Sequence, residues 1–137
     1  MDRPTRIVLV VEDEPLIRIN IADALEDAGF VVLEAASVLE AVGLLGQNDE
    51  VAAVFTDVDM PGGLTGLDLA GMVSRCTRRI GIVVTSGREV SPSALPDEAQ
   101  FLPKPYRLDT AIRAIEQAAC SDGDAISATA RDSRAMP

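Results

Sequence analysis

Carboxylate side chains follow two apolar runs of this 137-residue sequence. Glu12 and Asp13 come directly after Ile7–Val11, and Asp57 lies two residues beyond Val51–Phe55. Carboxylate oxygens without histidine or cysteine beside them favour Mg²⁺, which takes one or two protein carboxylates and keeps several waters. Three carboxylates are therefore one more than the metal needs. The surplus carboxylate is free to act as a nucleophile that forms an acyl phosphate, and Asp57 suits this role best because it stands by itself at a strand end.

A hydroxyl and an ammonium group follow two later apolar runs. Thr85 and Ser86 come after Ile80–Val84, and Lys104 follows Phe101-Leu102. Phosphoryl transfer needs mainly positioning and charge neutralisation from a protein, so a lysine and a hydroxyl donor suit phosphoryl oxygens. Adjacent strand residues point to opposite faces, so only one of the two hydroxyls can serve.

The apolar runs alternate with helix-like segments along the chain. A further strand is expected at Phe30–Leu33, and helices are expected after Pro15, after Ser37 and from Leu108. This alternation predicts a parallel sheet covered by helices on both faces. In such a sheet the carboxyl ends of the strands share one edge, where ligands bind at the point of reversed strand order. The polar side chains named above would converge there.

Two segments depart from this alternation. Pro92 and Pro96 leave room for at most a short helix within Gly87–Ala99, so the fourth helix of the pattern is expected to be shortened. From Ser121 onward the residues are small, polar and aperiodic, which predicts a disordered C-terminal tail over residues 121–137.

Composition limits the classes of function. The 22 acidic and 12 basic residues give a net charge of −10, which argues against a nucleic-acid or anionic-membrane surface. There is no histidine, which excludes Ser-His-Asp and Cys-His catalysis and a phosphohistidine carried by these residues. We find no signal peptide and no apolar stretch of membrane-spanning length, so we expect a cytoplasmic protein.

Four motifs occur in order along the chain: VLVVEDEP, VFTDVDMPGG, IVVTSG and FLPKPY. As an ordered set they resemble the receiver domains of two-component response regulators, over about residues 5–120. The resemblance implies one domain with a doubly wound, flavodoxin-like sheet of five parallel strands in the order 2-1-3-4-5.

The resemblance also implies a Mg²⁺ site with assigned ligands. Asp13 and Asp57 would bind the metal through their carboxylates, Asp59 through its backbone carbonyl and Glu12 through a bound water. Glu12 stands where the family more often has aspartate, so its carboxylate reaches one methylene further.

The same resemblance implies the phosphoryl site. Asp57 would be the phosphoacceptor, and Lys104 would hold the phosphoryl group, with the Lys104–Pro105 peptide bond in cis. Thr85 would be the switch hydroxyl and Phe101 the rotating aromatic residue.

These residues predict a stand-alone receiver that takes a phosphoryl group from a histidine kinase or a histidine phosphotransfer protein. It would be a Mg²⁺-dependent phosphoacceptor that catalyses its own phosphorylation and dephosphorylation, and not an enzyme in the ordinary sense. It would signal through protein contacts or act as a phosphoryl relay or sink, and the shortened helix favours the relay or sink.

Two alternatives stay open. One is a pseudo-receiver that binds partners without being phosphorylated. The other is a phosphohydrolase of the haloacid dehalogenase type, in which Asp57 and Asp59 would be nucleophile and proton donor.

Overall fold

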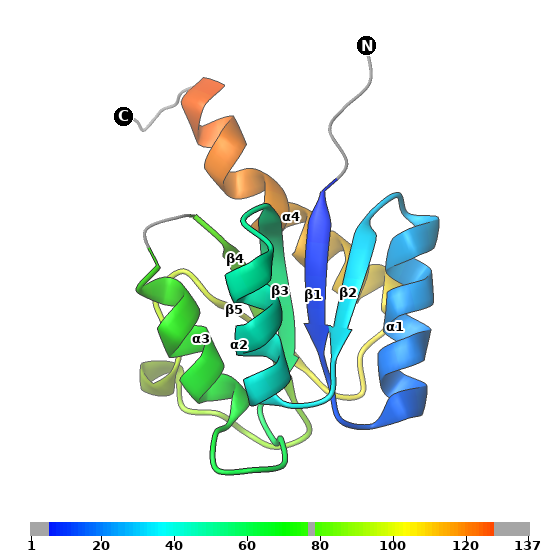
Figure 1. Ribbon diagram of the computed structural model, residues 1–137, viewed down its shortest axis with the longest axis vertical. Helices are drawn as coiled ribbons and strands as arrows, with labels where there is room; N and C mark the ends of the chain where they lie inside the picture. The colour runs from blue at the N-terminus through cyan, green and yellow to red at the C-terminus, as the bar shows by residue number, and fades with distance from the viewer. Residues whose placement is uncertain (1–5, 77–78, 128–137) are drawn as a thin grey trace.

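The computed structural model describes residues 6–76 and 79–127. Its five strands are all parallel and form one sheet in the order β2-β1-β3-β4-β5 (Figure 1), which confirms the predicted fold class. In chain order the elements are β1 (Ile7–Val11), α1 (Pro15–Asp27), β2 (Val31–Ala35), α2 (Val38–Gln47), β3 (Val51–Asp57), α3 (Gly66–Ser74), β4 (Gly81–Ser86), a 3-10 turn (Pro92–Ala94), β5 (Gln100–Pro103) and α4 (Leu108–Ser127).

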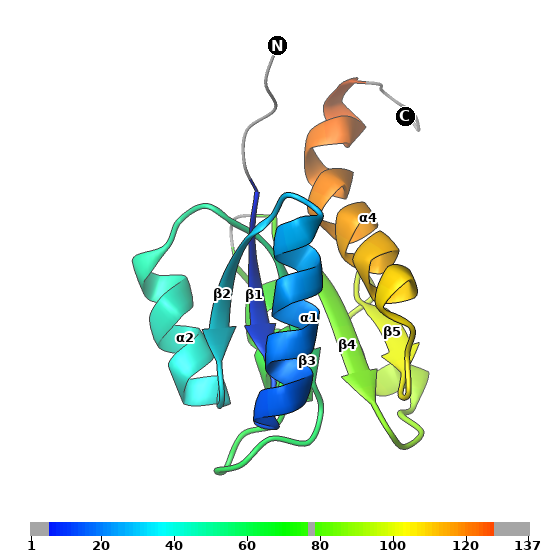
Figure 2. The ribbon, with the colours of Figure 1, turned by 90° about the vertical axis from the view of Figure 1, so that its right-hand side faces the viewer.

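Helices cover both faces of the sheet. α2 and α3 lie on one face, and α1 and α4 lie on the other (Figures 1 and 2). Strand residues therefore alternate between two buried clusters. Val54 and Ile82 pack with α2 and α3, whereas Phe55 and Val83 pack with α1 and α4. Strands that are buried on both faces need nearly continuous apolar sequences, which explains why short apolar runs predicted them.

Two of the central strands are longer than the apolar runs that predicted them. β3 continues through Asp57 and β4 through Ser86, because the ladder between these strands pairs Asp57 with Thr85. Both polar residues therefore belong to the sheet at its carboxyl edge. Their backbones are placed by strand pairing and not by a loop.

The connection between β4 and β5 contains no α-helix in the described residues, only the 3-10 turn Pro92–Ala94. This confirms the shortened fourth helix of the predicted pattern, and the label α4 belongs to the last helix of the chain. Val90, Leu95 and Ala99 of the connection pack against the cluster on the α2 and α3 side. An irregular segment thus covers part of the sheet that a helix would otherwise cover.

The last helix is longer than the sequence pattern predicts. α4 continues through Ser127, whereas we expected a disordered tail from Ser121; residues 128–137 of that tail lie outside the described residues. No proline occurs between Pro105 and Pro137, and an internal glycine such as Gly123 costs only about 1 kcal/mol relative to alanine. Extending an existing helix is much easier than nucleating one, so a weak helical sequence continues it.

A membrane span needs a long apolar helix, and none of the helices in the described ranges meets that requirement.

Candidate functional site

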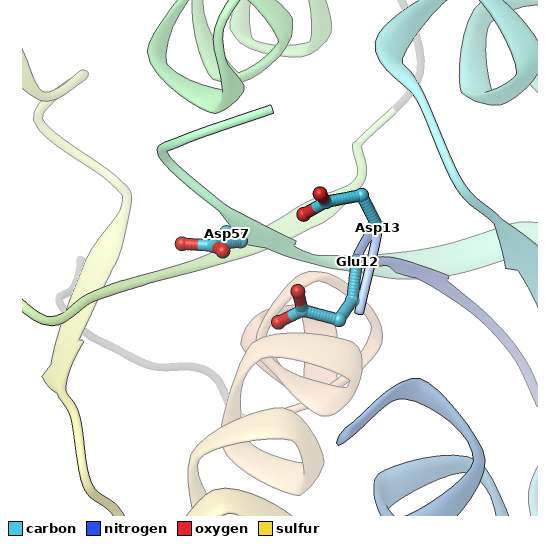
Figure 3. A group of neighbouring side chains, drawn as sticks. All are labelled: Glu12, Asp13 and Asp57. Atoms are coloured by element: carbon cyan, nitrogen blue, oxygen red, sulfur yellow. The ribbon is translucent and has the colours of Figure 1, made fainter. Parts of the chain in front are cut away.

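The carboxyl ends of β1 and β3 bring three carboxylates together (Figure 3). Glu12, Asp13 and Asp57 each offer an oxygen that lies within 4.8 Å of the other two. Glu12 and Asp57 are buried, with 3% and 6% of their surface exposed, whereas Asp13 is exposed. β1 and β3 are neighbours in the sheet, so two segments about 45 residues apart in sequence form one acidic cluster.

Lys104 connects two of these carboxylates. Its Nζ donates hydrogen bonds to Oε1 of Glu12 and to Oδ2 of Asp57, both at 3.1 Å. Burial lowers the pKa of Lys104, but the hydrogen bonds to the two carboxylates outweigh this effect and the pKa is raised. The lysine is therefore a charged ammonium group. The Lys104–Pro105 peptide bond is cis, as expected.

The acidic cluster carries more negative charge than Lys104 compensates. Burial raises the pKa of Glu12 and the Asp57 charge adds to this, while hydrogen bonds from the Glu14 backbone N–H and from Lys104 act in the opposite direction. The net direction of the Glu12 pKa is upward, because burial and the neighbouring Asp57 charge outweigh these hydrogen bonds. A divalent cation would relieve this repulsion, and a donor set made of carboxylate oxygens suits Mg²⁺. The residues present therefore fit this metal.

The carboxylate of Asp59 pairs with Arg88, an arginine that the sequence patterns did not single out. Its carboxylate accepts a hydrogen bond from Nη2 of Arg88 at 2.7 Å, and this pairing lowers the pKa of Asp59. Its backbone N–H lies 3.4 Å from Oδ1 of Asp57. Arg88 follows β4 in an irregular loop, where no periodic pattern marks it, so only the fold reveals the pair.

Thr85 lies beside Asp57 on the neighbouring strand, in register with it and on the same face of the sheet. The residue is 1% exposed, and Oγ1 has no hydrogen-bond partner within the described residues. An unpaired buried hydroxyl costs about 1–3 kcal/mol. Ser86 points to the other face, where its Oγ accepts a hydrogen bond from the Arg88 backbone N–H. The strand register thus places Thr85, and not Ser86, on the same face as Asp57.

Phe101 lies on the opposite face of the sheet from Thr85. β5 pairs Phe101 with Val84 and Leu102 with Thr85. Phe101 is partly buried and packs against the cluster on the α2 and α3 side. The side chains of Phe101 and Thr85 therefore face opposite sides of the sheet.

Tyr106 borders the site, although the sequence patterns gave it no role. Its ring packs edge-on against Phe55, with the ring centroids 5.6 Å apart. It also lines a cleft of about 530 Å³ beside Lys104, formed together with Ile17, Asn20, Gly87, Pro105 and Leu108. An open cleft with apolar walls therefore adjoins the acidic cluster.

We expect Tyr106 to ionise near pH 12. Burial raises the pKa of its phenol to about 12 from the usual 10, and the Glu12 charge acts in the same direction. Because the folded-state pKa lies above the unfolded one, the stabilising contribution is complete below pH 10 and is lost as the pH rises through 12.

The chain has one tyrosine and no tryptophan, so phenolate absorbance after a rapid pH jump reports on Tyr106 without interference. The urea-unfolded chain should titrate near pH 10, as free tyrosine does. A midpoint near 10 while circular dichroism still shows the folded chain would contradict this prediction.

Comparison with known proteins shows which protein family this chain is similar to. The family model described as the response regulator receiver domain matches residues 8–116. Sensor kinase CckA of Brucella abortus (strain 2308) is 37% identical over 106 residues, covering 74% of this chain and 11% of the kinase. An uncharacterized response regulatory protein of Vibrio vulnificus (strain CMCP6) is 31% identical over 116 residues, covering 81% of this chain and 48% of that protein.

Solved structures agree with these sequence relatives. A receiver domain protein from Clostridium thermocellum superposes with a TM-score of 0.78 at 28% identity, covering 86% of this chain and 97% of that one. The present chain spans less than half the length of both curated relatives above.

Proposed function

Since this chain belongs to the response regulator receiver domain family of two-component signalling, we propose that it accepts a phosphoryl group on Asp57 from a phosphohistidine. The donor is a histidine kinase or a histidine phosphotransfer protein. No histidine occurs in these 137 residues, so the donor imidazole lies outside them. The similarity to a sensor kinase supports a place in such a pathway.

The transfer is a nucleophilic substitution at phosphorus. A carboxylate oxygen of Asp57 forms the new O–P bond as the N–P bond of the donor breaks, and the imidazole nitrogen leaves with the electron pair and takes a proton. Lys104 lies 3.1 Å from Oδ2 of Asp57 and would neutralise the charge of the incoming phosphoryl oxygens. Attack of water on the resulting acyl phosphate returns Asp57 and inorganic phosphate, which makes the modification reversible.

Asp13 and Asp57 would hold Mg²⁺ through their carboxylates, Asp59 through its backbone carbonyl and Glu12 through a water molecule. When bound, the metal offsets the negative charge that gathers on the phosphoryl oxygens and on the cluster itself. Glu12 is buried and hydrogen-bonded to Lys104, so it also keeps the ammonium group next to the acceptor.

The observation that carries the proposal is the orphaned hydroxyl of Thr85. Oγ1 is buried, lacks a partner within the described residues and lies on the strand paired with Asp57. Buried hydroxyl groups without partners are rare in folded proteins. A phosphoryl oxygen on Asp57 would supply the missing acceptor, so Thr85 is the switch hydroxyl of the proposal.

We expect Thr85→Val to have opposite effects on the free and the phosphoryl-bound states. Valine removes the unsatisfied hydroxyl at nearly constant shape, so the free protein should be equally stable or about 1 kcal/mol more stable. The phosphoryl-bound state loses a hydrogen bond. Thermal unfolding with and without Mg²⁺ and beryllium fluoride, a phosphoryl analogue, measures both effects.

The matched control is Ser86→Ala, which removes the neighbouring hydroxyl, whose oxygen already has a partner. It should lower the stability of the free protein and leave the stabilisation by the analogue unchanged. Equal stabilisation of wild type and Thr85→Val by the analogue would overturn the role of Thr85.

The cleft beside Lys104 supports docking of a donor protein. Its walls are largely apolar. The first turns of α1 lie next to it and expose Ile19 and Leu16, and 77% of the surface of Leu16 is accessible to solvent. Exposed apolar side chains that gather at one place mark contact surfaces. The receiver and its donor protein would meet in the cytoplasm.

Output from this receiver is proposed to run through protein contacts or through onward transfer of the phosphoryl group. An irregular connection replaces a helix between β4 and β5. Phe101, partly buried on β5, is the proposed aromatic switch residue. The irregular connection has no regular helix face that a partner could bind. The relay or sink is therefore the favoured role.

A further inference from the structure

Arg18 joins three elements at the base of the acidic cluster. It lies in the second turn of α1, and its Nη1 donates a hydrogen bond to the backbone carbonyl of Glu12 at 2.9 Å. Its Nε donates to Oε1 of Glu34 on β2 at 3.1 Å. Only 19% of its side chain is exposed. One guanidinium group thus ties α1 to the end of β1 and to β2.

The carbonyl that Arg18 holds lies just beyond the sheet ladder. Pairing of β1 with β3 ends at Val11 and Thr56, so the carbonyl of Glu12 is past the last paired residue. The N–H of Glu12 donates to the carbonyl of Ala35 on β2 at 3.0 Å. Both polar groups of the Glu12 backbone are therefore fixed. The orientation of the peptide between Glu12 and Asp13 sets the direction in which the Asp13 carboxylate leaves the chain.

We propose that Arg18 is a positioning residue for the metal site. It holds the Glu12–Asp13 peptide so that both carboxylates face Asp57, and Glu34 holds the guanidinium group in the required plane. The inference rests on the proposed function in one respect, the binding of Mg²⁺ by this cluster. Lysine cannot replace arginine here, because an ammonium group lacks the planar set of donors that reaches two partners at once.

Groups that orient metal ligands without touching the metal change its affinity by about 10-fold or more when they are removed. We therefore expect Arg18→Ala and Arg18→Lys to raise the Mg²⁺ concentration at half-saturation by roughly 10-fold. Glu34→Gln should have a smaller effect in the same direction, because the contact with the Glu12 carbonyl remains.

The experiment is a Mg²⁺ titration of the full chain, followed by calorimetry and by the emission of Tyr106, the sole tyrosine in a chain without tryptophan. The matched control is Ile21→Val, which removes one buried methyl group from the same helix. This control should lower the unfolding temperature and leave the Mg²⁺ midpoint unchanged. At saturating Mg²⁺ the Arg18 variants should reach the wild-type end point, because the ligands themselves are intact.

Three outcomes would overturn the inference: an unchanged Mg²⁺ midpoint in folded Arg18 variants, an equal shift in Ile21→Val, or no Mg²⁺ response in the wild type. A wild type that binds Mg²⁺ with the expected variant pattern, yet takes no phosphoryl group from any donor, would support the role of Arg18. In that case the proposed function alone would fail.

Discussion

Asp57→Asn is expected to abolish the covalent phosphoryl adduct that the wild-type chain should form with acetyl phosphate and Mg²⁺. The amide oxygen of asparagine is a far weaker nucleophile than a carboxylate, and the substitution hardly changes the shape of the side chain. Lys104 would still donate its 3.1 Å hydrogen bond to Glu12, so the site should stay assembled. Intact-protein mass measures the adduct directly, and chelation of Mg²⁺ should prevent its formation.

The control for this experiment is Asp59→Asn. It makes the same chemical change two residues away, on a carboxylate that pairs with Arg88 and not with Lys104. This variant should keep the adduct. An adduct on Asp57→Asn that equals the wild-type one would contradict the assignment of the acceptor.

Two other results would point to the alternative functions. No adduct on the wild type with acetyl phosphate or with candidate kinases would favour a pseudo-receiver that only binds partners. Steady release of phosphate from a phosphomonoester, in place of one phosphorylation per chain, would favour a phosphohydrolase.

Gly66→Ala is expected to destabilise the protein and to slow phosphorylation of Asp57. Gly66 begins α3, and its N–H donates to the carbonyl of Val58 at 2.8 Å, which ties the helix to the end of β3. A methyl group on Gly66 would overlap the backbone carbonyl of Asp57. Either the helix or the acceptor strand must then move, and overpacking of this kind costs about 1–3 kcal/mol.

Urea unfolding and the rate of adduct formation measure the two effects of this substitution. Gly63→Ala is the matched control, because a methyl group there meets no atom within 4 Å in the same β3–α3 connection. It should behave as the wild type does. Equal stability and equal rates for the two variants would show that α3 does not constrain the acceptor in this way.

Much of the fold could be predicted from the sequence because each central strand is buried on both faces. Such strands must be apolar throughout, so the polar residues Glu12, Asp13 and Asp57 at their carboxyl ends are visible as interruptions of apolar runs. The prolines at 92 and 96 likewise predicted a connection without a full helix, since proline lacks the N–H that a helix interior needs.

Contacts between elements could not be predicted in this way, because they depend on how distant segments cross. Lys104 reaches Glu12 across 92 positions of sequence, and Arg88 reaches Asp59 across 29. The choice of Thr85 over Ser86 needed the β3–β4 register, since a shift of one residue exchanges the two faces of a strand.

By itself, then, the sequence determined which side chains stand at the carboxyl edge of the sheet, because local apolar patterning marks the strand ends. The tertiary structure decided which of them touch, and it added Arg18, Arg88 and Tyr106 to the site. The physical reason is that side-chain contacts arise from the packing of whole elements, and no periodic pattern within one element records its neighbours.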